Sequence, residues 1–218
     1  MPGVRELDRA IRERHLLKHP FYRAWSCGEL PIETLRSYAS QYYRFESNFP
    51  RYVGGVYARL TDPASRRTLL ENLLDEEGRT PTHPELWLRF ARGIGADTTA
   101  VTTARPSAAT RGLLEEYERS TLDSSVARGL GALYAYESIF PEIAAEKSRG
   151  LRAFYGLRSR EAHEFFRVHT FADVEHARAE RSLLRREIDR GAGAARDARR
   201  GVRGAIDAWW SFLSSFGA

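Results

Sequence analysis

The stretch Arg167–Ala179 reads R-V-H-T-F-A-D-V-E-H-A-R-A, and the rest of the chain is interpreted around it. His169, Asp173 and His176 are spaced i, i+4 and i+7, so on a helix at about 100° per residue they fall within an arc of roughly 60°. Apolar residues, Phe165 among them, lie on or beside the same arc, which therefore faces a core. Burying two imidazoles and a carboxylate without partners would cost several kcal/mol. This pattern predicts half of a metal site.

The periodicity is helical nearly throughout, and no run shows the alternation expected of a strand. With 218 residues, no internal repeat and no evident boundary, the chain is predicted to form one all-α domain over residues 1–218. Residues 96–107 read as a surface connection, and 190–204 read as either a loop or a loosely helical joint. The expected helices cover about residues 4–17, 21–27, 32–60 with a kink at Pro50, 62–77, 82–93, 108–121, 125–148, 160–189 and, packed on the bundle, 195–216.

The composition is that of a globular protein, with 42% hydrophobic and 29% charged residues. The net charge is +5, but basic and acidic residues alternate and no nucleic-acid-binding module is evident, so we expect no nucleic-acid partner. No apolar run approaches the roughly 18 residues of a membrane span, and the N-terminus has no secretory core. Cys27 is the only cysteine, which excludes an internal disulfide. We therefore expect a cytoplasmic protein without a membrane partner.

The basic residues show a bias that bears on function. Of 34 basic residues, only Lys18 and Lys147 are lysines. Wherever the chain needs a generic positive charge it uses arginine, so each lysine raises the question of what an amine does there that a guanidinium does not.

Further candidate ligands lie in three other places. Glu137 is in the middle of an apolar helical face, where the alternative interpretation is a core glutamate bonded to a tyrosine or an arginine. Glu76 falls in the last turn of one expected helix and His83 opens the next, and a tight corner of this kind aims both side chains at one point. Each of these signals is weak alone, since acidic helix ends and N-terminal histidines are common.

Together the candidates supply three carboxylates and three imidazoles, a set that suits two first-row metal ions with open positions for dioxygen. One carboxylate is expected to bridge the two ions. The chain has no Glu-x-x-His motif, which disfavours a ferritin-like bundle. We expect His15, His19 and His163 to be surface or structural residues. The predicted ligands are Glu76, His83, Glu137, His169, Asp173 and His176.

Several motifs carry a family resemblance over about residues 5–190. They are H-P-F-Y at 19–22, F-P-R-Y at 49–52, D-E-E-G at 75–78, H-P-E-L-W at 83–87, Y-A-Y-E-S-I-F-P-E-I-A at 134–144, and H-x-x-x-D-x-x-H from His169. In these the chain resembles the haem-oxygenase-like di-metal oxidases, and within them the CADD-like branch. The resemblance implies a seven-helix haem-oxygenase-like bundle and a homodimer. Thiaminase-II-like and pyrroloquinoline-quinone-synthase-like proteins of the same superfamily lack the full di-metal ligand set.

The resemblance also implies an activity. CADD-like proteins make 4-aminobenzoate, the folate precursor, from their own side chains in a single turnover. By position in the motifs, Tyr22 matches the tyrosine that supplies the ring and carboxyl carbon, and Lys147 matches the lysine that supplies the nitrogen. The six candidate ligands match the family's metal ligands. The implied cofactors are two metal ions, Fe/Fe or Mn/Fe, with dioxygen as co-substrate and an external reductant from an unidentified electron donor.

The residues themselves support Lys147 as the nitrogen source, because an amine can be oxidised and can hand over its nitrogen. A positive charge near a helix C-terminus is also favoured by the helix dipole, which explains the charge but not the choice of lysine. Ten residues of straight helix between Glu137 and Lys147 would span about 15 Å, more than a lysine side chain covers. A bend at Pro141 would change that geometry. Tyr22 taken alone reads as a core aromatic residue.

Three alternatives remain at this point. A conventional di-metal oxygenase would use the same ligands on an external amino acid or fatty acid. A thiaminase-like hydrolase would use Cys27 as its nucleophile, although no recognisable motif pairs a histidine with it. A non-enzymatic role in protein interaction, such as death-domain binding, predicts binding that is independent of the metal ligands.

Overall fold

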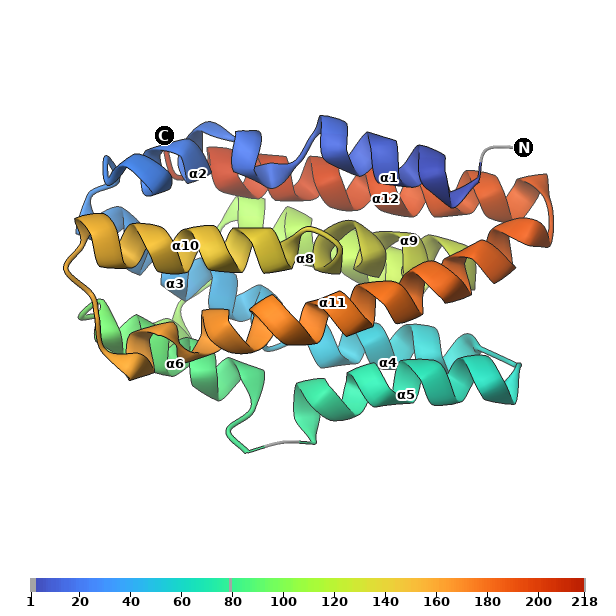
Figure 1. The fold of residues 1–218 in the computed structure, drawn as a ribbon, viewed down its shortest axis with the longest axis horizontal. Coiled ribbons are helices and arrows are strands. Elements are labelled where there is room, and N and C mark those ends of the chain that lie inside the picture. The colour runs from blue at the N-terminus through green and yellow to red at the C-terminus, as the bar shows by residue number, and fades with distance from the viewer. Residues whose placement is uncertain (1–2, 79, 218) are drawn as a thin grey trace.

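The computed structural model describes residues 3–78 and 80–217, and this part of the chain contains helices but no β-strand. The all-α prediction is confirmed. None of the described helices is long and apolar enough to cross a membrane. The helices, shown in Figure 1, are α1 (Val4–Glu13), the 3₁₀ helix η1 (Leu16–Lys18), α2 (Pro20–Cys27), α3 (Ile32–Glu46), α4 (Phe49–Arg59), α5 (Pro63–Glu77), α6 (His83–Gly93), α7 (Thr98–Thr103), α8 (Ala108–Thr121), α9 (Val126–Glu137), α10 (Phe140–Phe154), α11 (Arg160–Asp189) and α12 (Ala192–Ser214).

Two of the long helices predicted from the sequence are interrupted. The expected helix 32–60 breaks between α3 and α4, and the expected helix 125–148 breaks between α9 and α10. Pro50 and Pro141 lie in the first turn of the helix that follows each break. Proline has no N–H to donate and is tolerated there, so it marks a new helix where a kink was predicted. The bundle therefore has more helices than the seven that the resemblance implies.

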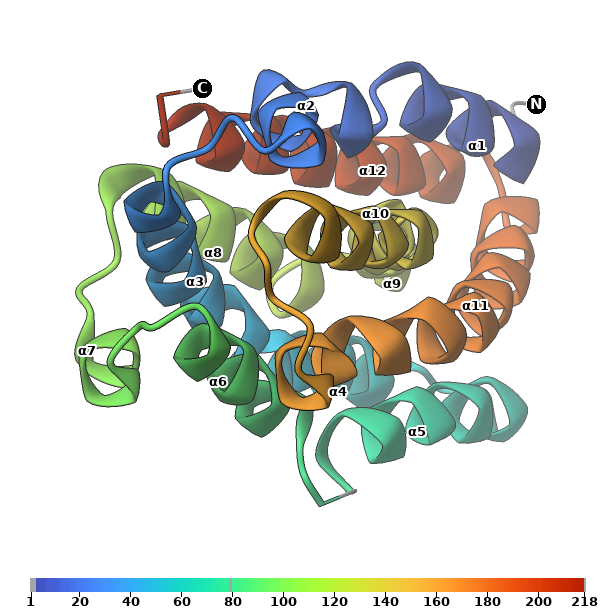
Figure 2. The same ribbon diagram turned by 60° about the vertical axis from the view of Figure 1, so that its left-hand side comes forward.

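Three connections are more helical than predicted. Residues 98–103 within the expected surface connection form α7, and residues 150–154 continue α10. The joint at 190–204 is regular helix from Ala192 onward, so the interpretation as a loop was wrong. The C-terminal helix packs on the bundle as predicted, lying along α9 and beside α1 (Figures 1 and 2).

Small residues allow α12 to approach α9 closely. A Cβ atom added at Gly201 of α12 would overlap the backbone carbonyl oxygen of Arg128 in α9. Gly131 of α9 is in the same situation against the carbonyl oxygen of Ala198. These two glycines are therefore the residues that let the two backbones meet.

The core is unusually aromatic. Tyr42 lies against Trp87 with ring centroids 4.0 Å apart, and Tyr136 stacks on Trp209 at 4.7 Å with an interplanar angle of 8°. Such pairs each contribute about 0.5–1.5 kcal/mol beyond the area they bury. These rings form an apolar wall on α3, α6, α9 and α12, and the polar cluster described below is enclosed by it.

The close approach of α9 and α12 gives a stability prediction. We expect Gly201→Ala to lower the free energy of unfolding by about 1–3 kcal/mol, because the added methyl group forces the helices apart. The urea midpoint should fall while the m-value stays unchanged. Gly112→Ala in α8 is the matched control, since its site is exposed with open space around it. This control should stabilise the protein by about 0.5–1 kcal/mol. Equal stability of Gly201→Ala and the wild type would contradict the packing argument.

Candidate metal centre

Local helix signals position the candidate ligands. Ser159 caps the N-terminus of α11 by accepting a hydrogen bond from the Ala162 N–H. His169, Asp173 and His176 then follow on the buried face of this helix, with 4%, 2% and 2% of their surface exposed. The structure thus brings the arc predicted from the spacing into the interior.

The corner between α5 and α6 supplies two more residues. Thr82 and Glu85 form a reciprocal capping box that holds His83 in the first turn of α6. Glu76 lies in the last turn of α5, and its Oε2 is 2.8 Å from His83 Nδ1. Both side chains are buried.

One group of possible ligands forms around His176. Its Nδ1 lies 3.2 Å from Glu137 Oε1 and 3.9 Å from Glu76 Oε1. One ligand atom from each of these three residues lies within 4.8 Å of the others. Asp173 Oδ1 is 3.9 Å from the same His176 nitrogen. The group therefore offers several carboxylate oxygens and one imidazole nitrogen to a cation.

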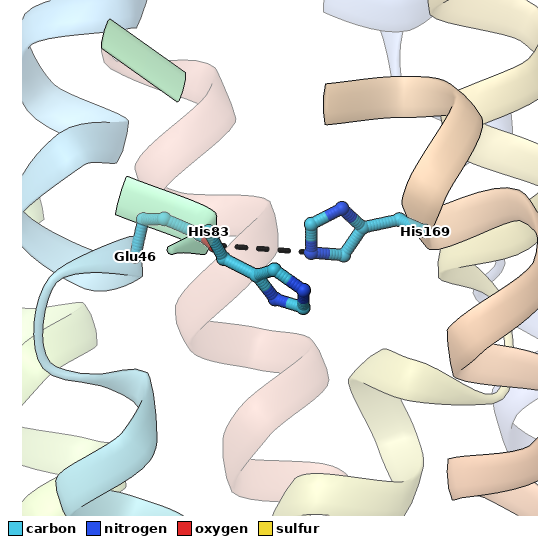
Figure 3. A group of neighbouring side chains, drawn as sticks. All are labelled: Glu46, His83 and His169. Carbon is cyan, nitrogen blue, oxygen red and sulfur yellow. Dashed lines mark ion pairs between the residues drawn. The ribbon is translucent and has the colours of Figure 1, made fainter. Parts of the chain in front are cut away.

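A second group contains His83, His169 and Glu46, a residue that the sequence analysis missed. The ligand atoms of these three side chains also lie within 4.8 Å of one another. Figure 3 shows the side chains converging from α6, α11 and α3. The His169 Nδ1–H donates to the carbonyl oxygen of Phe165 at 2.8 Å, which leaves Nε2 facing Glu46 Oε1 at 3.8 Å. The second group is richer in nitrogen than the first.

Glu76 faces both groups, because one of its oxygens is near His83 and the other is near His176. A carboxylate with this placement is suited to bridging two cations. The six side chains predicted from the sequence are therefore all buried around one interior region, with Glu46 beside them.

The electrostatics of this region favour a cation. Burial, and then the charge of Glu76, raises the pKa of Glu46 to about 8. Burial, and then Glu137, raises the pKa of Asp173 well above its usual value. Burial opposes the charged form of His176, yet Glu137, Glu76 and Asp173 outweigh it and raise the pKa of this imidazole to about 10. Carboxylates packed this closely in a low-dielectric interior destabilise one another unless positive charge neutralises them.

Unsatisfied oxygens give the same indication. Glu46 Oε1, Glu137 Oε2 and both oxygens of Glu180 are buried without a hydrogen-bond partner among the described residues. Orphaned buried carboxylate oxygens are costly, and a bound ion is one of the few things that satisfies them. The donor set of imidazoles and carboxylates therefore fits a pair of first-row metal ions.

Glu180 and Asp75 are also part of this region and were not predicted. Glu180 is fully buried and lies one turn after His176 on α11. Burial raises the pKa of Glu180, and the nearby Glu137 carboxylate raises it further. Extending the opening arc by one turn would have found Glu180. Asp75 Oδ2 lies 3.2 Å from His176 Nε2. This second contact orients the imidazole, as outer carboxylates commonly do for metal-bound histidines.

A surface pocket reaches this centre. It has a volume of about 310 Å³ and is lined by Asp75, His83, Arg167, Val168, Phe171 and Ala172. Phe171 is 70% exposed at its rim. The pocket therefore brings the candidate ligand His83 close to the protein surface.

Lys147 occupies an aromatic box inside the bundle. It is 1% exposed, and its Nζ donates a hydrogen bond of 2.7 Å to the Tyr38 hydroxyl. The Tyr38 hydroxyl is also 3.1 Å from that of Tyr22, and Nζ lies 5.3 Å from the centre of the Tyr22 ring. The rings of Trp25, Tyr38, Tyr42, Trp87, Phe140 and Phe166 lie 4.8–5.8 Å from the same nitrogen.

A helix break lies between Glu137 and Lys147. Because α9 ends at Glu137 and α10 begins at Phe140, the ten residues between the two side chains are not one straight helix. Burial lowers the pKa of Lys147 well below its usual value, with the charge of Glu46 opposing this in part. Burial likewise raises the pKa of Tyr22. Burial thus acts on both groups toward their neutral forms, on the Lys147 amine and on the Tyr22 phenol.

Other candidates lie outside this region. Cys27 is exposed at the end of α2, away from the buried imidazoles and carboxylates. His15 and His19 accept hydrogen bonds from the backbone N–H groups of Leu17 and Phe21. His163 is held by the Ser148 hydroxyl and the Leu157 carbonyl oxygen. These three histidines cap or fasten the backbone, as expected of structural residues.

Comparison with known proteins agrees with these observations. Residues 36–210 match the sequence profile of a family described as iron-containing redox enzymes. A 4-aminobenzoate synthase of Chlamydia pneumoniae is 38% identical to this chain over 210 residues, covering 96% of this chain and 92% of that protein. A 4-aminobenzoate synthase of Nitrosomonas europaea is 37% identical, covering 95% and 88% respectively.

A solved structure shares the fold. A CADD-like protein of unknown function from Nostoc punctiforme superimposes with a TM-score of 0.77 over 97% of this chain and 96% of its own, at 20% sequence identity.

The burial of Lys147 gives a pH-dependent prediction. Between its lowered native pKa and the ordinary value of 10.5, the unfolded chain binds one proton more than the folded one. Stability owed to this group therefore rises with pH by about 1.4 kcal/mol per unit. We expect Lys147→Met to melt at a higher temperature than the wild type near neutral pH, with the gap narrowing as the pH rises toward 10.5.

Lys18→Met is the matched control for this measurement, because Lys18 is the other lysine and is exposed. The melting temperature of Lys18→Met should differ from that of the wild type by the same small amount at every pH tested. A Lys147→Met gap that stays constant with pH would show that the buried amine is not neutral.

Proposed function

The chain belongs to the haem-oxygenase-like family of iron-containing redox enzymes, and on this premise we propose that it makes 4-aminobenzoate from its own Tyr22 and Lys147. The relatives that are 37–38% identical over nearly the whole chain are named 4-aminobenzoate synthases. The observation that carries the proposal to particular residues is the hydrogen-bonded series Lys147–Tyr38–Tyr22, which is sealed in an aromatic box.

The proposed metal ligands are Glu76, His83, Glu137, His169, Asp173 and His176. Two iron ions, or one manganese and one iron, held there would activate dioxygen with electrons from an external donor. We further propose that the chain works as a homodimer, as the resemblance implies.

The protein's own residues prepare the reaction. A neutral amine has a free lone pair, so burial makes Lys147 Nζ a competent nitrogen donor, which an always-charged arginine is not. The Tyr38 hydroxyl contacts both reacting groups and is placed to pass a proton between the amine and the Tyr22 phenol. The surrounding rings exclude water, which would otherwise protonate the amine and compete with it.

The overall change balances as an oxidation by dioxygen. The Cα–Cβ bond of Tyr22 breaks, the ring departs with Cβ, and Cβ is oxidised to the carboxyl carbon. The Lys147 nitrogen replaces the phenol oxygen through a new C–N bond, and that oxygen leaves as water. The Cε–Nζ bond of Lys147 breaks, and Cε is oxidised to an aldehyde. Dioxygen is reduced, with the external donor supplying the remaining electrons. Both side chains are consumed, so one chain gives at most one molecule of product.

Isotope labelling tests the origin of the nitrogen. We expect protein grown with ¹⁵N-lysine, then given Fe²⁺, a reductant and oxygen, to release 4-aminobenzoate that carries the label. Only Lys18 and Lys147 can supply it. Lys18→Arg should release the same labelled product, while Lys147→Arg should release none, because a guanidinium keeps its charge and its nitrogens. Labelled product from Lys147→Arg would rule out this nitrogen source.

The fate of Tyr22 is read by peptide mass spectrometry of the same samples. Trypsin cleaves after Lys18 and Arg23, so Tyr22 lies in a short peptide from residue 19 to residue 23. The intact form of this peptide should decrease in proportion to product released, and Tyr22→Phe should make no product. Product formed with the peptide intact, or more than one product per chain after adding an amino acid or fatty acid, would instead favour an oxygenase with an external substrate.

A further inference from the structure

Glu46 is the last residue of α3, and its position is unusual for a carboxylate. It is 4% exposed, and it follows aromatic residues on the face of α3 that is buried in the core. The C-terminal end of a helix carries partial negative charge, so an anion placed there is repelled rather than stabilised. A buried glutamate at this position needs a cation nearby.

The imidazole nitrogen that faces Glu46 is a hydrogen-bond acceptor, whereas a carboxylate needs a hydrogen-bond donor. His169 Nδ1 is committed to the Phe165 carbonyl oxygen, which only accepts, so this nitrogen carries the proton and Nε2 of the neutral ring carries a lone pair. Glu46 Oε1 faces that Nε2 at 3.8 Å and has no hydrogen-bond partner among the described residues. With Glu46 ionised, two electron-rich atoms therefore face one another at a distance too long for a hydrogen bond.

The gap between these atoms has the dimensions of a metal site. His83 completes the group, with its ring centroid 4.3 Å from that of His169 and its ligand atom within 4.8 Å of the others. Two ligand atoms that each lie about 2.0–2.2 Å from one first-row ion are separated by roughly 3–4 Å. Figure 3 shows the three side chains converging on one point from three helices.

We propose that Glu46 is a direct ligand of the metal ion that His83 and His169 hold, in addition to the six ligands named above. The inference rests on the proposed pair of metal ions, and it assigns the ligands to one ion or the other. Glu46, His83 and His169 would hold one ion, and Glu137 and His176 would hold the other with Asp173 beside them. Glu76, whose two oxygens face the two groups, would be shared between them. The first site is rich in imidazole and the second in carboxylate.

The placement also connects the metal region to the reacting side chains. Tyr38, Tyr42 and Glu46 are spaced i, i+4 and i+8 on α3, so they follow one another along a single face of the helix. Tyr38 holds Lys147, and Tyr42 lies between Tyr38 and Glu46. A metal ion bound by Glu46 is therefore fixed to the same helix that positions the amine and the phenol.

The test is Mn²⁺ binding to Glu46→Gln, because Mn²⁺ is visible by electron paramagnetic resonance and binds without starting the reaction. We expect the wild type to bind two Mn²⁺ ions per chain. The variant should bind one ion as the wild type does and the other at least about 10–100-fold more weakly. Removing even a residue that only contacts a metal ligand lowers metal affinity by this factor. Anomalous scattering from Mn²⁺-loaded crystals should show the weakened ion beside His83 and His169.

Glutamine is nearly the same size as glutamate, so the variant separates a ligand from a neutral core acid. If Glu46 were only a protonated carboxylic acid, its amide replacement would bind both ions with wild-type affinity, and that result would overturn the proposal. Glu116→Gln is the matched control, since Glu116 is a buried glutamate paired with Arg128 outside the metal region. It should bind two ions normally.

A stability measurement guards against misfolding. The metal-free Glu46→Gln protein should melt no lower than the metal-free wild type, and it should gain less on adding Mn²⁺, because less binding energy is coupled to folding. An equal gain in both proteins would count against the proposal.

The outcome is independent of the proposed reaction. A wild type that binds two ions, with Glu46→Gln losing one, supports the ligand role even when no 4-aminobenzoate is formed. Formation of 4-aminobenzoate with unchanged Mn²⁺ binding in Glu46→Gln leaves the function standing and refutes the ligand role.

Discussion

The structure depends on accommodating an excess of buried carboxyl groups in an aromatic core. Five acids, Glu46, Glu76, Glu137, Asp173 and Glu180, and three imidazoles, His83, His169 and His176, lie in the interior of the bundle. The one lysine buried with them among the described residues is itself disfavoured as a cation by its burial. Ionised carboxylates in such a medium are tolerated only with a compensating charge. A pair of divalent cations bound there would supply it, so the same arrangement that costs stability in the metal-free protein would favour metal binding.

The helix breaks place two of these groups at helix ends. Glu137 is the last residue of α9, and Lys147 lies on the next helix, α10. The break after Glu46 likewise ends α3 at the metal region instead of carrying the helix past it. In both places a proline begins the next helix, where its missing N–H costs nothing.

The sequence predicted those parts of this arrangement whose residues lie within a few turns of one helix. His169, Asp173 and His176 are close in sequence, so their spacing alone places them on one face of a helix. The capping-box residues Thr82 and Glu85 likewise indicate that a helix begins at His83. Glu46 could not be found in the same way, because it follows a run of aromatic residues and its partners are 37 and 123 residues away in the chain. Each of Pro50 and Pro141 is compatible with a kink inside one helix and with the start of a new helix. Packing decides between these two structures, so the sequence alone predicted kinks. The family resemblance supplied what spacing could not, namely that Tyr22 and Lys147 belong beside the ligands.

The strong preference of this chain for arginine gives the buried lysine its meaning. A guanidinium stays charged in any protein interior, so an arginine in the aromatic box would have to remain a cation there, stabilised by the ring faces but short of hydrogen-bond partners. A lysine can lose its proton instead, and the single hydrogen bond to Tyr38 then suffices for its amine. Cation–π attraction and desolvation thus act in opposite directions on Lys147, and its burial lowers its pKa and so favours the neutral form. Neutrality gives the amine the lone pair that nitrogen transfer requires, so the stability argument and the chemical argument select the same residue type at this position.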